Sequence, residues 1–191
     1  MNSSEFKIVK NSQYKIMPWK NGLGSTAQID IAPEGAKFPE GPFLWRVSSA
    51  TVSASSPFSQ FPGCDRWLVV LRGEGLLLNG KKLLPMQPLH FSGDELIHCD
   101  LITHEVLDLG VIYPRDQVQA VMTVHNFKTG EVLECGGTSE YFYIYCALGG
   151  FRWSDQDLEQ GDTLSLMQVS QGALIAKSDA SCVVIRLQVR T

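Results

Sequence analysis

The sequence predicts an all-β fold of two small barrel-like lobes. Three observations support this prediction: the apolar residues recur mostly with a period of two, turn-forming residues separate the apolar runs, and a pattern from the first half recurs in the second. A length of 191 residues fits one compact domain or two small fused lobes. No long amphipathic helical pattern is present, and we expect at most one helical turn, at 114–120.

The composition is that of a globular protein, with 44% apolar and 19% charged residues. Sixteen Lys and Arg against twenty Asp and Glu give a net charge of −4, which disfavours nucleic acid as a partner. The N-terminal residues lack the apolar stretch of a secretory signal, and no apolar run is long enough to span a membrane. The five cysteines are widely spaced and form no C-x-x-C pair. We therefore expect a cytoplasmic protein with reduced thiols.

The clearest strand is Phe43–Val52, in which successive side chains are expected to point to opposite faces. Trp45 and Val47 share one face, which we expect to lie in the core. Arg46 and Ser48 share the other face, which either meets water or lines the mouth of a barrel.

A hairpin follows further along the chain. The apolar runs Trp67–Leu71 and Leu76–Leu78 flank a turn or bulge. Asn79-Gly80 then predicts a type I′ turn, because that turn needs positive φ at both central residues. Later strands are expected at Leu89–Phe91, His104–Tyr113, Ala120–His125, Tyr141–Leu148, Thr163–Met167, Ala173–Ala176 and Cys182–Val189.

A shift of 75 residues (144 − 69 = 75) lays Val69–Phe91 on Ile144–Leu166 without a gap, and Asn79-Gly80 meets a second turn pair, 154–155. Any two β-hairpins could align in this way. Taken as a repeat, the match predicts a first lobe over 1–116 and a second over 117–191, with the barrels themselves at 15–113 and about 120–189.

Two fused barrels of this size are typical of a double cupin, or bicupin. A cupin usually holds a metal through His-x-His, a nearby Glu and a later His, because imidazole and carboxylate groups at those spacings converge on one ion. This sequence has no His-x-His, and Asp65 and Arg66 stand in the segment Phe61–Trp67 that would carry it. We expect no metal and no cofactor. The four histidines are His90, His98, His104 and His125.

The segment Met17–Gly24 is a candidate binding loop, because its Pro and Gly residues prevent regular structure. Trp19, Lys20 and Asn21 would offer a small anion an apolar wall, a cation and an amide. The alternative is a connecting loop in which Trp19 serves as a plug.

Arg46 is the candidate anion clamp, because the guanidinium fork can bind both oxygens of a carboxylate. A second loop, 55–66, has aromatic anchors and ends at Asp65 and Arg66. Neighbouring residues on a strand point to opposite faces, so only one of these two can enter a pocket.

Signatures of nucleophilic catalysis are absent from the sequence. There is no G-x-S-x-G motif, and the Gly73-Glu-Gly75 segment is too short to be a dinucleotide loop. Asp108 and His90 are the candidates for a general acid or base.

Three segments resemble the HutD/Ves family associated with bacterial histidine-utilisation genes. They read MPWKNGLGSTAQIDIAP, FLWRVSSATVSASSPFSQFPGCDRWLVVLRGEGLLLNG and LLPMQPLHFSGD, and the resemblance is strongest over 13–116. It implies a cytoplasmic bicupin without the usual metal ligands. It also implies a role in regulating histidine catabolism through a small ligand.

The resemblance implies a set of pocket residues as well. The sequence departs from the family pattern at Leu23 and across 108–115, where Gly110 and Pro114 are unusual and Arg115 alone matches. The implied ligand-binding residues are Trp19, Lys20, Asn21, Arg46, Ser48, Phe61, Asp65, Arg66 and Arg115.

Three functions remain open at this point. The first is a ligand-binding regulatory protein for a small carboxylate such as formate, a formyl or formimino amino acid, or urocanate. The second is a metal-independent cupin enzyme, an isomerase or lyase acting on a similar acid. The third is a scaffold whose barrels mediate dimerisation. The expected partner is a small carboxylate, with no nucleic acid and no membrane, and a homodimer is compatible with the sequence.

Overall fold

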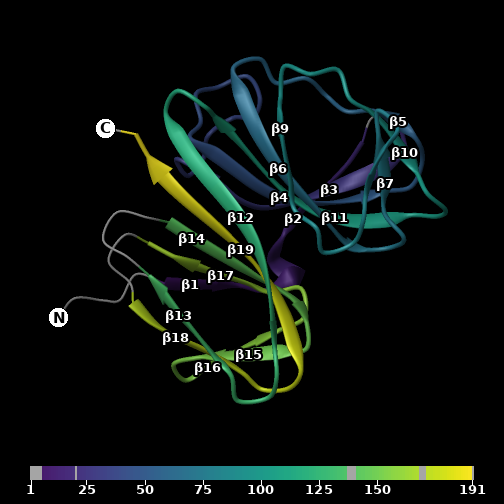
Figure 1. The fold of residues 1–191 in the computed structure, drawn as a ribbon. Coiled ribbons are helices and arrows are strands. Elements are labelled where there is room, and N and C mark those ends of the chain that lie inside the picture. Colours follow the sequence, from purple (N-terminus) through teal and green to yellow (C-terminus); the bar gives the residue numbers. More distant parts are fainter. Residues whose placement is uncertain (1–5, 20, 137–140, 168–170, 191) are drawn as a thin grey trace. The chain divides into compact units, whose positions relative to one another are not determined.

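The computed structural model describes residues 6–19, 21–136, 141–167 and 171–190. Within these ranges nearly every regular element is a β-strand, and the one helical element is a short 3-10 helix, η1 (Asn11–Gln13) (Figure 1). The prediction of an all-β fold is confirmed. At 114–120 there is no helix: a hydrogen bond from Gln117 N to Pro114 O closes one tight turn, and strands lie on both sides of it.

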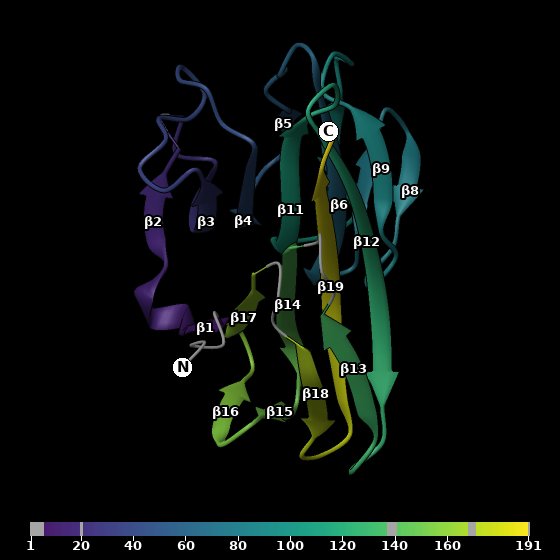
Figure 2. The same ribbon diagram turned by 90° about the vertical axis from the view of Figure 1, so that its left-hand side faces the viewer.

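The chain divides into two compact units. Among the described residues, the N-terminal unit consists of Lys15–Gln119 with Arg190, and the C-terminal unit consists of residues 6–14 together with Ala120–Val189. Residues 6–14 were expected in the first lobe, but the structure groups them with the second. The reason is strand pairing, because β1 (Phe6–Val9) runs antiparallel to β17 (Thr163–Leu166). The two strands are neighbours in Figure 2.

The N-terminal unit contains a six-stranded and a four-stranded antiparallel sheet. Its strands are β2 (Lys15–Pro18), β3 (Gly24–Ala32), β4 (Trp45–Val52), β5 (Ser56–Pro57), β6 (Cys64–Arg72), β7 (Leu76–Leu78), β8 (Lys81–Leu83), β9 (Leu89–Ser92), β10 (His98–Leu101) and β11 (Val106–Pro114). The strand orders are β2-β3-β4-β11-β6-β9 and β5-β10-β7-β8. Apolar side chains such as Leu68, Val70 and Leu76 form the core of this unit.

The C-terminal unit contains a five-stranded and a four-stranded sheet. Besides β1 and β17, its strands are β12 (Val118–Phe127), β13 (Val132–Gly136), β14 (Tyr141–Leu148), β15 (Gly150–Trp153), β16 (Gln156–Glu159), β18 (Gln171–Ala176) and β19 (Ala180–Val189). The strand orders are β1-β17-β14-β19-β12 and β13-β18-β15-β16. Its core includes Phe151, Leu158 and Leu174, which are fully buried.

The hairpin at Asn79-Gly80 is confirmed. Both residues have positive φ, 49° and 79°, and β7 pairs with β8 directly across them. The repeat is also present, because β7, β8 and β9 are followed 75 residues later by β15, β16 and β17, with bounds that differ by one residue at most.

The predicted repeat is wrong by one residue in its first strand. It matched Val69 with Ile144, but the core residue of the N-terminal unit that is equivalent to Ile144 is Leu68. The pairing irregularities explain the slip. β6 skips one residue against β11 beside Val70, and β14 skips one against β19 beside Cys146. Aligning these two positions matches β6 to β14 with an offset of 76 (146 − 70 = 76).

Strand β3 is the largest element that the sequence did not predict. It has nine residues, of which Ile29 and Ile31 alone are buried, and its first half consists of Gly, Ser, Thr, Ala and Gln. A strand with this little apolar alternation gives almost no periodic signal.

Candidate functional site

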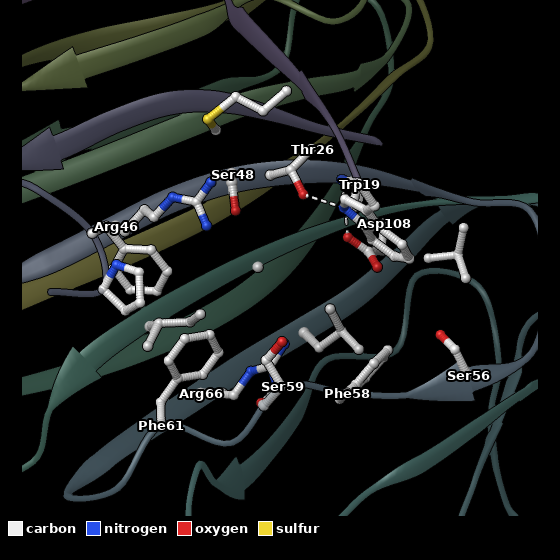
Figure 3. Close-up of a pocket in the computed structure, with 18 of the residues that line it drawn as sticks. Trp19, Thr26, Arg46, Ser48, Ser56, Phe58, Ser59, Phe61, Arg66 and Asp108 are labelled. Carbon is white, nitrogen blue, oxygen red and sulfur yellow. Dashed lines mark hydrogen bonds between the residues drawn. The ribbon is translucent and has the colours of Figure 1, made fainter. Parts of the chain in front are cut away.

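A cavity of about 690 Å³ lies in the N-terminal unit, over the centre of its six-stranded sheet (Figure 3). Strands β4, β11 and β6 supply its floor, and three loop segments near Trp19, Phe38 and Phe58 supply its walls. Its size is within the range of small-molecule sites, about 300–1,000 Å³.

The floor is built from rows of residues that pair across β4, β11 and β6, each row running perpendicular to the strands. In the first row Arg46 pairs with Ile112, which pairs on its other side with Arg66. In the next row that faces the cavity, Gly110 lies between Ser48 and Leu68. Alternate residues of a strand share a face, so these rows place Arg46, Ser48 and Arg66 together.

Arg46 is buried at one end of the cavity, with 9% of its surface exposed. Its Nε donates to Gln28 Oε1 at 3.1 Å, and its guanidinium lies 4.6 Å from the ring centre of Phe38. Figure 3 shows the guanidinium extending beside Ser48. Burial lowers the pKa of Arg46, but a guanidinium remains protonated at neutral pH. In the described part of the chain, the structure records no carboxylate paired with this cation.

Arg66 is enclosed by aromatic rings. Its guanidinium lies 5.0, 5.5 and 5.1 Å from the ring centres of Phe58, Phe61 and Phe91, within the range of cation–π attraction. Its Nη1 also donates to Ser59 O at 3.3 Å. Burial lowers the pKa of Arg66 to about 10, so it carries its charge at neutral pH.

Asp108 lies in the third row of the floor, between Ala50 and Val70. Only 5% of its surface is exposed, and its Oδ1 accepts a hydrogen bond from Ala50 N at 3.1 Å. Burial raises the pKa of this carboxyl to about 7, although the charge of Arg66 and the Ala50 N–H act in the opposite direction. Both protonation states are therefore accessible near neutral pH.

The loop after β2 reaches the cavity through Trp19 and Asn21. Trp19 Nε1 donates to Thr26 Oγ1 at 2.8 Å, which fixes the indole as an apolar wall. Asn21 Oδ1 accepts from Leu23 N at 3.0 Å, so its carbonyl oxygen holds the turn. Lys20, the cation predicted for this loop, lies outside the described residues.

Six of the nine predicted binding residues line the cavity, but Asp65 and Arg115 do not. Arg115 Nε pairs with Asp65 Oδ1 at 2.8 Å, and its Nη2 donates to Ser92 Oγ at 2.9 Å and to Asp94. Asp65 and Arg66 are neighbours on β6, so their side chains point to opposite faces of the sheet. This is why Arg66 lines the cavity and Asp65 does not. The six residues are Trp19, Asn21, Arg46, Ser48, Phe61 and Arg66.

His90, the other candidate for acid–base chemistry, is not a lining residue of the cavity. Its Nε2 lies 3.1 Å from Tyr113 Oη and 3.5 Å from Asp65 Oδ2. Asp108 is therefore the one of the two candidates that the fold brings to the cavity.

Sequence reasoning missed Gln28, Phe38 and Phe58 as parts of the site. Gln28 lies on the unpredicted strand β3, and its position beside Arg46 depends on strand register. Phe58 stands in the loop whose aromatic residues were noted as anchors. Phe38 had no signal beyond its place in a Pro- and Gly-rich segment.

The described residues contain no group of three or more His, Cys, Asp or Glu that could hold a metal ion. Over the same ranges, the structure has no helix of the length and apolarity needed to cross a membrane.

Comparison with known proteins identifies the relatives of this chain. The profile of the HutD family matches residues 11–184. An uncharacterised 21.2 kDa protein in the hutC 3′ region of Pseudomonas putida is 34% identical over 122 residues, or 61% of this chain and 63% of that protein. Protein Ves of Citrobacter koseri is 31% identical over 112 residues, 56% of each chain. The chain thus matches less than two thirds of the length of either relative.

Solved structures match over nearly the whole chain. A conserved protein of unknown function from Pseudomonas aeruginosa PAO1 has a TM-score of 0.84 at 28% identity, covering 97% of this chain and 100% of that one. HutD from Pseudomonas fluorescens SBW25, solved in a formate condition, has a TM-score of 0.80 with the same identity and coverage. A nickel(II) complex of the Escherichia coli pirin YhhW has a TM-score of 0.68 at 11% identity, covering 96% and 99% of the two chains, and shows the shared bicupin fold alone.

Proposed function

The chain belongs to the HutD family, and from this premise we propose that it is a regulatory protein that binds a small carboxylate in the cavity of its N-terminal unit. The observation that carries the proposal is Arg46, a buried guanidinium at a cavity wall whose neighbours Gln28 and Phe38 hold it without neutralising it. A buried guanidinium is stabilised most by an opposite charge, so an anionic ligand that pairs with Arg46 would bind favourably there.

The geometry of Arg46 suits a carboxylate. Because Nε is occupied by Gln28, the two Nη groups are the donors left to meet both oxygens of a ligand. Ser48 stands on the same face of β4 and supplies a hydroxyl beside them. Phe38 and Phe61 give the site apolar walls, which strengthen a charge-assisted hydrogen bond by excluding water.

Two relatives support the choice of ligand and process. The Pseudomonas putida relative is named for its place in the hutC 3′ region, and the Pseudomonas fluorescens HutD structure was solved in a formate condition. We propose accordingly that the ligand is a small acid of histidine utilisation, such as formate, a formyl or formimino amino acid, or urocanate.

The test is calorimetric titration of the protein with formate, N-formylglutamate, formiminoglutamate and urocanate. At least one acid should bind, and Arg46→Ala should weaken that binding by about tenfold to a hundredfold, because a charge-assisted pair contributes roughly 1.5–3 kcal/mol. Arg46→Lys keeps the charge but loses the fork, so it should also bind more weakly. Arg152→Ala, at an exposed ion pair of the C-terminal unit, is the matched control. If Arg46→Ala binds the acid with wild-type affinity, the proposal that Arg46 binds the carboxylate is wrong.

Asp108 favours a second candidate, a metal-independent isomerase or lyase. A carboxyl with a pKa of about 7 in a ligand cavity is suited to general acid–base work. NMR spectroscopy of each bound acid incubated with the protein separates the two functions. New resonances that require the wild-type Asp108 would establish catalysis, whereas unchanged spectra alongside measured binding support a binding protein.

A further inference from the structure

The edges of the four sheets differ in how they are protected against pairing with another chain. We propose that the edge of β12, over residues 121–127, is a self-association surface at which two copies of the chain pair antiparallel about a twofold axis. This pairing joins the five-stranded sheets of two C-terminal units into one continuous sheet. The surface belongs to the C-terminal unit and is independent of the cavity.

The N-terminal unit provides an internal comparison for this edge. Strands β6 and β11 correspond to β14 and β19, so β4, the other neighbour of β11, corresponds to β12. The far side of β4 is covered by β3, which pairs with it antiparallel from Gly24 to Ala32. In the described part of the chain, the five-stranded sheet ends at β12, and no strand takes the place of β3. The shared strand plan therefore accommodates one more antiparallel strand at this edge.

The backbone of this edge is available for pairing. An edge strand turns the N–H and C=O groups of alternate residues away from its sheet, where an added strand can bind them. Among the described residues, none of the backbone hydrogen bonds made outside strand pairs uses a group of 121–127. Six of these seven residues are partly or fully exposed, and only Met122 is buried. A second strand can therefore reach the edge.

Strand β12 also lacks the features that keep sheet edges from pairing. Proteins protect edges with charged side chains, with proline or by keeping the edge strand short. In the described sheets, seven strands besides β12 lie at an edge, and six of them contain Lys, Asp, Glu or Pro. The seventh, β9, has only four residues. Strand β12 has ten residues and none of these four types, which is the character of an interaction edge.

A second copy of β12 fits this edge without a conflict of charges. Residues directly opposite in an antiparallel pair lie on the same face of the sheet, so a twofold axis normal to the sheet passes through a residue. The middle of the exposed stretch is Val124, which then lies opposite the same residue of the second copy. In this register Thr123 is opposite His125, and Val121 is opposite Phe127. Pairs of β-branched and aromatic side chains favour cross-strand contact, and no like charges meet.

Analytical ultracentrifugation of the full chain tests the proposal. Over a concentration series from about 1 μM to about 1 mM, the wild-type protein should pass from monomer to dimer. Val124→Lys sets two ammonium groups against each other at the axis, so it should weaken association about tenfold or more, and Val124→Glu should do the same. The matched control is Ile175→Lys, at an exposed apolar residue of β18, a strand paired on both sides. It should associate like the wild-type protein.

Two further measurements separate association from folding. An equimolar mixture of Val124→Lys and Val124→Glu should form a heterodimer, because opposite charges then meet at the axis, and misfolded variants could not do so. In the wild-type protein, hydrogen exchange over 121–127 should slow as the concentration rises, while exchange in β8, at another edge, should stay constant. A protein that stays monomeric throughout, or a dimer that Val124→Lys leaves intact, would overturn the proposal. Slower exchange confined to another segment would also overturn it.

Discussion

The two units share one strand plan but differ in what fills the interior. Aligned on their equivalent pairing irregularities, Arg66 of the N-terminal unit corresponds to Phe142, Asp108 to Cys182 and Gly110 to Val184. The three C-terminal residues are buried members of a continuous apolar core, whereas the three N-terminal residues line a cavity. The same strand plan therefore holds a cavity in the N-terminal unit, where two charged residues and a glycine stand in place of three core residues of the C-terminal unit.

The largest effect is expected from moving a charge into the filled unit. Phe142→Arg places a guanidinium in a dry core without the ring cage that surrounds Arg66, so it should lower the free energy of unfolding by roughly 3–5 kcal/mol. The reverse change, Arg66→Phe, should cost far less, because the cavity leaves room for the ring. Urea denaturation of both variants measures the difference, and similar losses would show that the interiors do not differ as described.

Filling the cavity should weaken binding of the proposed ligand. Gly110→Val gives β11 the residue found at the equivalent place in β19, and we expect affinity for the ligand to fall at least tenfold. A Cβ at Gly110 would lie 3.2 Å from Trp67 O, so about 1–3 kcal/mol of stability should be lost as well. Calorimetry on variant protein with native circular dichroism checks the first effect, and retained affinity would mean that the ligand lies elsewhere.

Asp108 should make the stability of the N-terminal unit depend on pH. Cys182, the equivalent residue of the C-terminal unit, should have no such effect there. Burial raises the pKa of Asp108 to about 7, whereas an aspartate in the unfolded chain titrates near pH 4. Between these values the folded state binds more protons, so the contribution of this group to stability falls as the pH rises.

Asp108→Asn removes that dependence and keeps an oxygen for the Ala50 N–H. Its free energy of unfolding should match that of the wild-type protein to within about 1 kcal/mol at pH 4.5 and exceed it by roughly 3 kcal/mol at pH 8. Denaturant unfolding at the two pH values measures this. A constant difference would show that Asp108 is ionised throughout.

The smallest effect concerns the two equivalent hairpins. Asn79 and Ser154 both have positive φ, 49° and 56°, but Asn79 also donates Nδ2 to Leu96 O at 3.1 Å and accepts from His98 N at 2.8 Å. Asn79→Ala should therefore cost about 1–2 kcal/mol and Ser154→Ala less than about 1 kcal/mol. Thermal unfolding compares them, and an equal cost would assign the whole effect to backbone strain.

The sequence predicts the fold better than the site because period and turn chemistry are local, whereas a cavity depends on register. The alternation around Arg46 shows that it shares a face with Ser48, but it cannot show whether that face meets water. Asp65 and Arg66 illustrate the same limit. Alternation places their side chains on opposite faces of the sheet, but it does not tell which of the two lines the cavity. Asp108 reaches the cavity only because β11 pairs with β4 and β6 in one particular register. Gln28 lies on β3 and Phe38 lies in a loop, and neither segment has a periodic pattern from which its place at the site could be predicted.

The pairing of β1 with β17 has a consequence for how the chain is made. Phe6 pairs with Leu166, so the first strand has no partner until 160 further residues (166 − 6 = 160) have been synthesised. At about 5–20 residues per second, that wait is about 8–32 s on the ribosome. Lys15–Gln119, by contrast, contains every strand of its own two sheets and can close while translation continues. The cavity of the N-terminal unit can therefore be complete on the nascent chain before β1 pairs with β17.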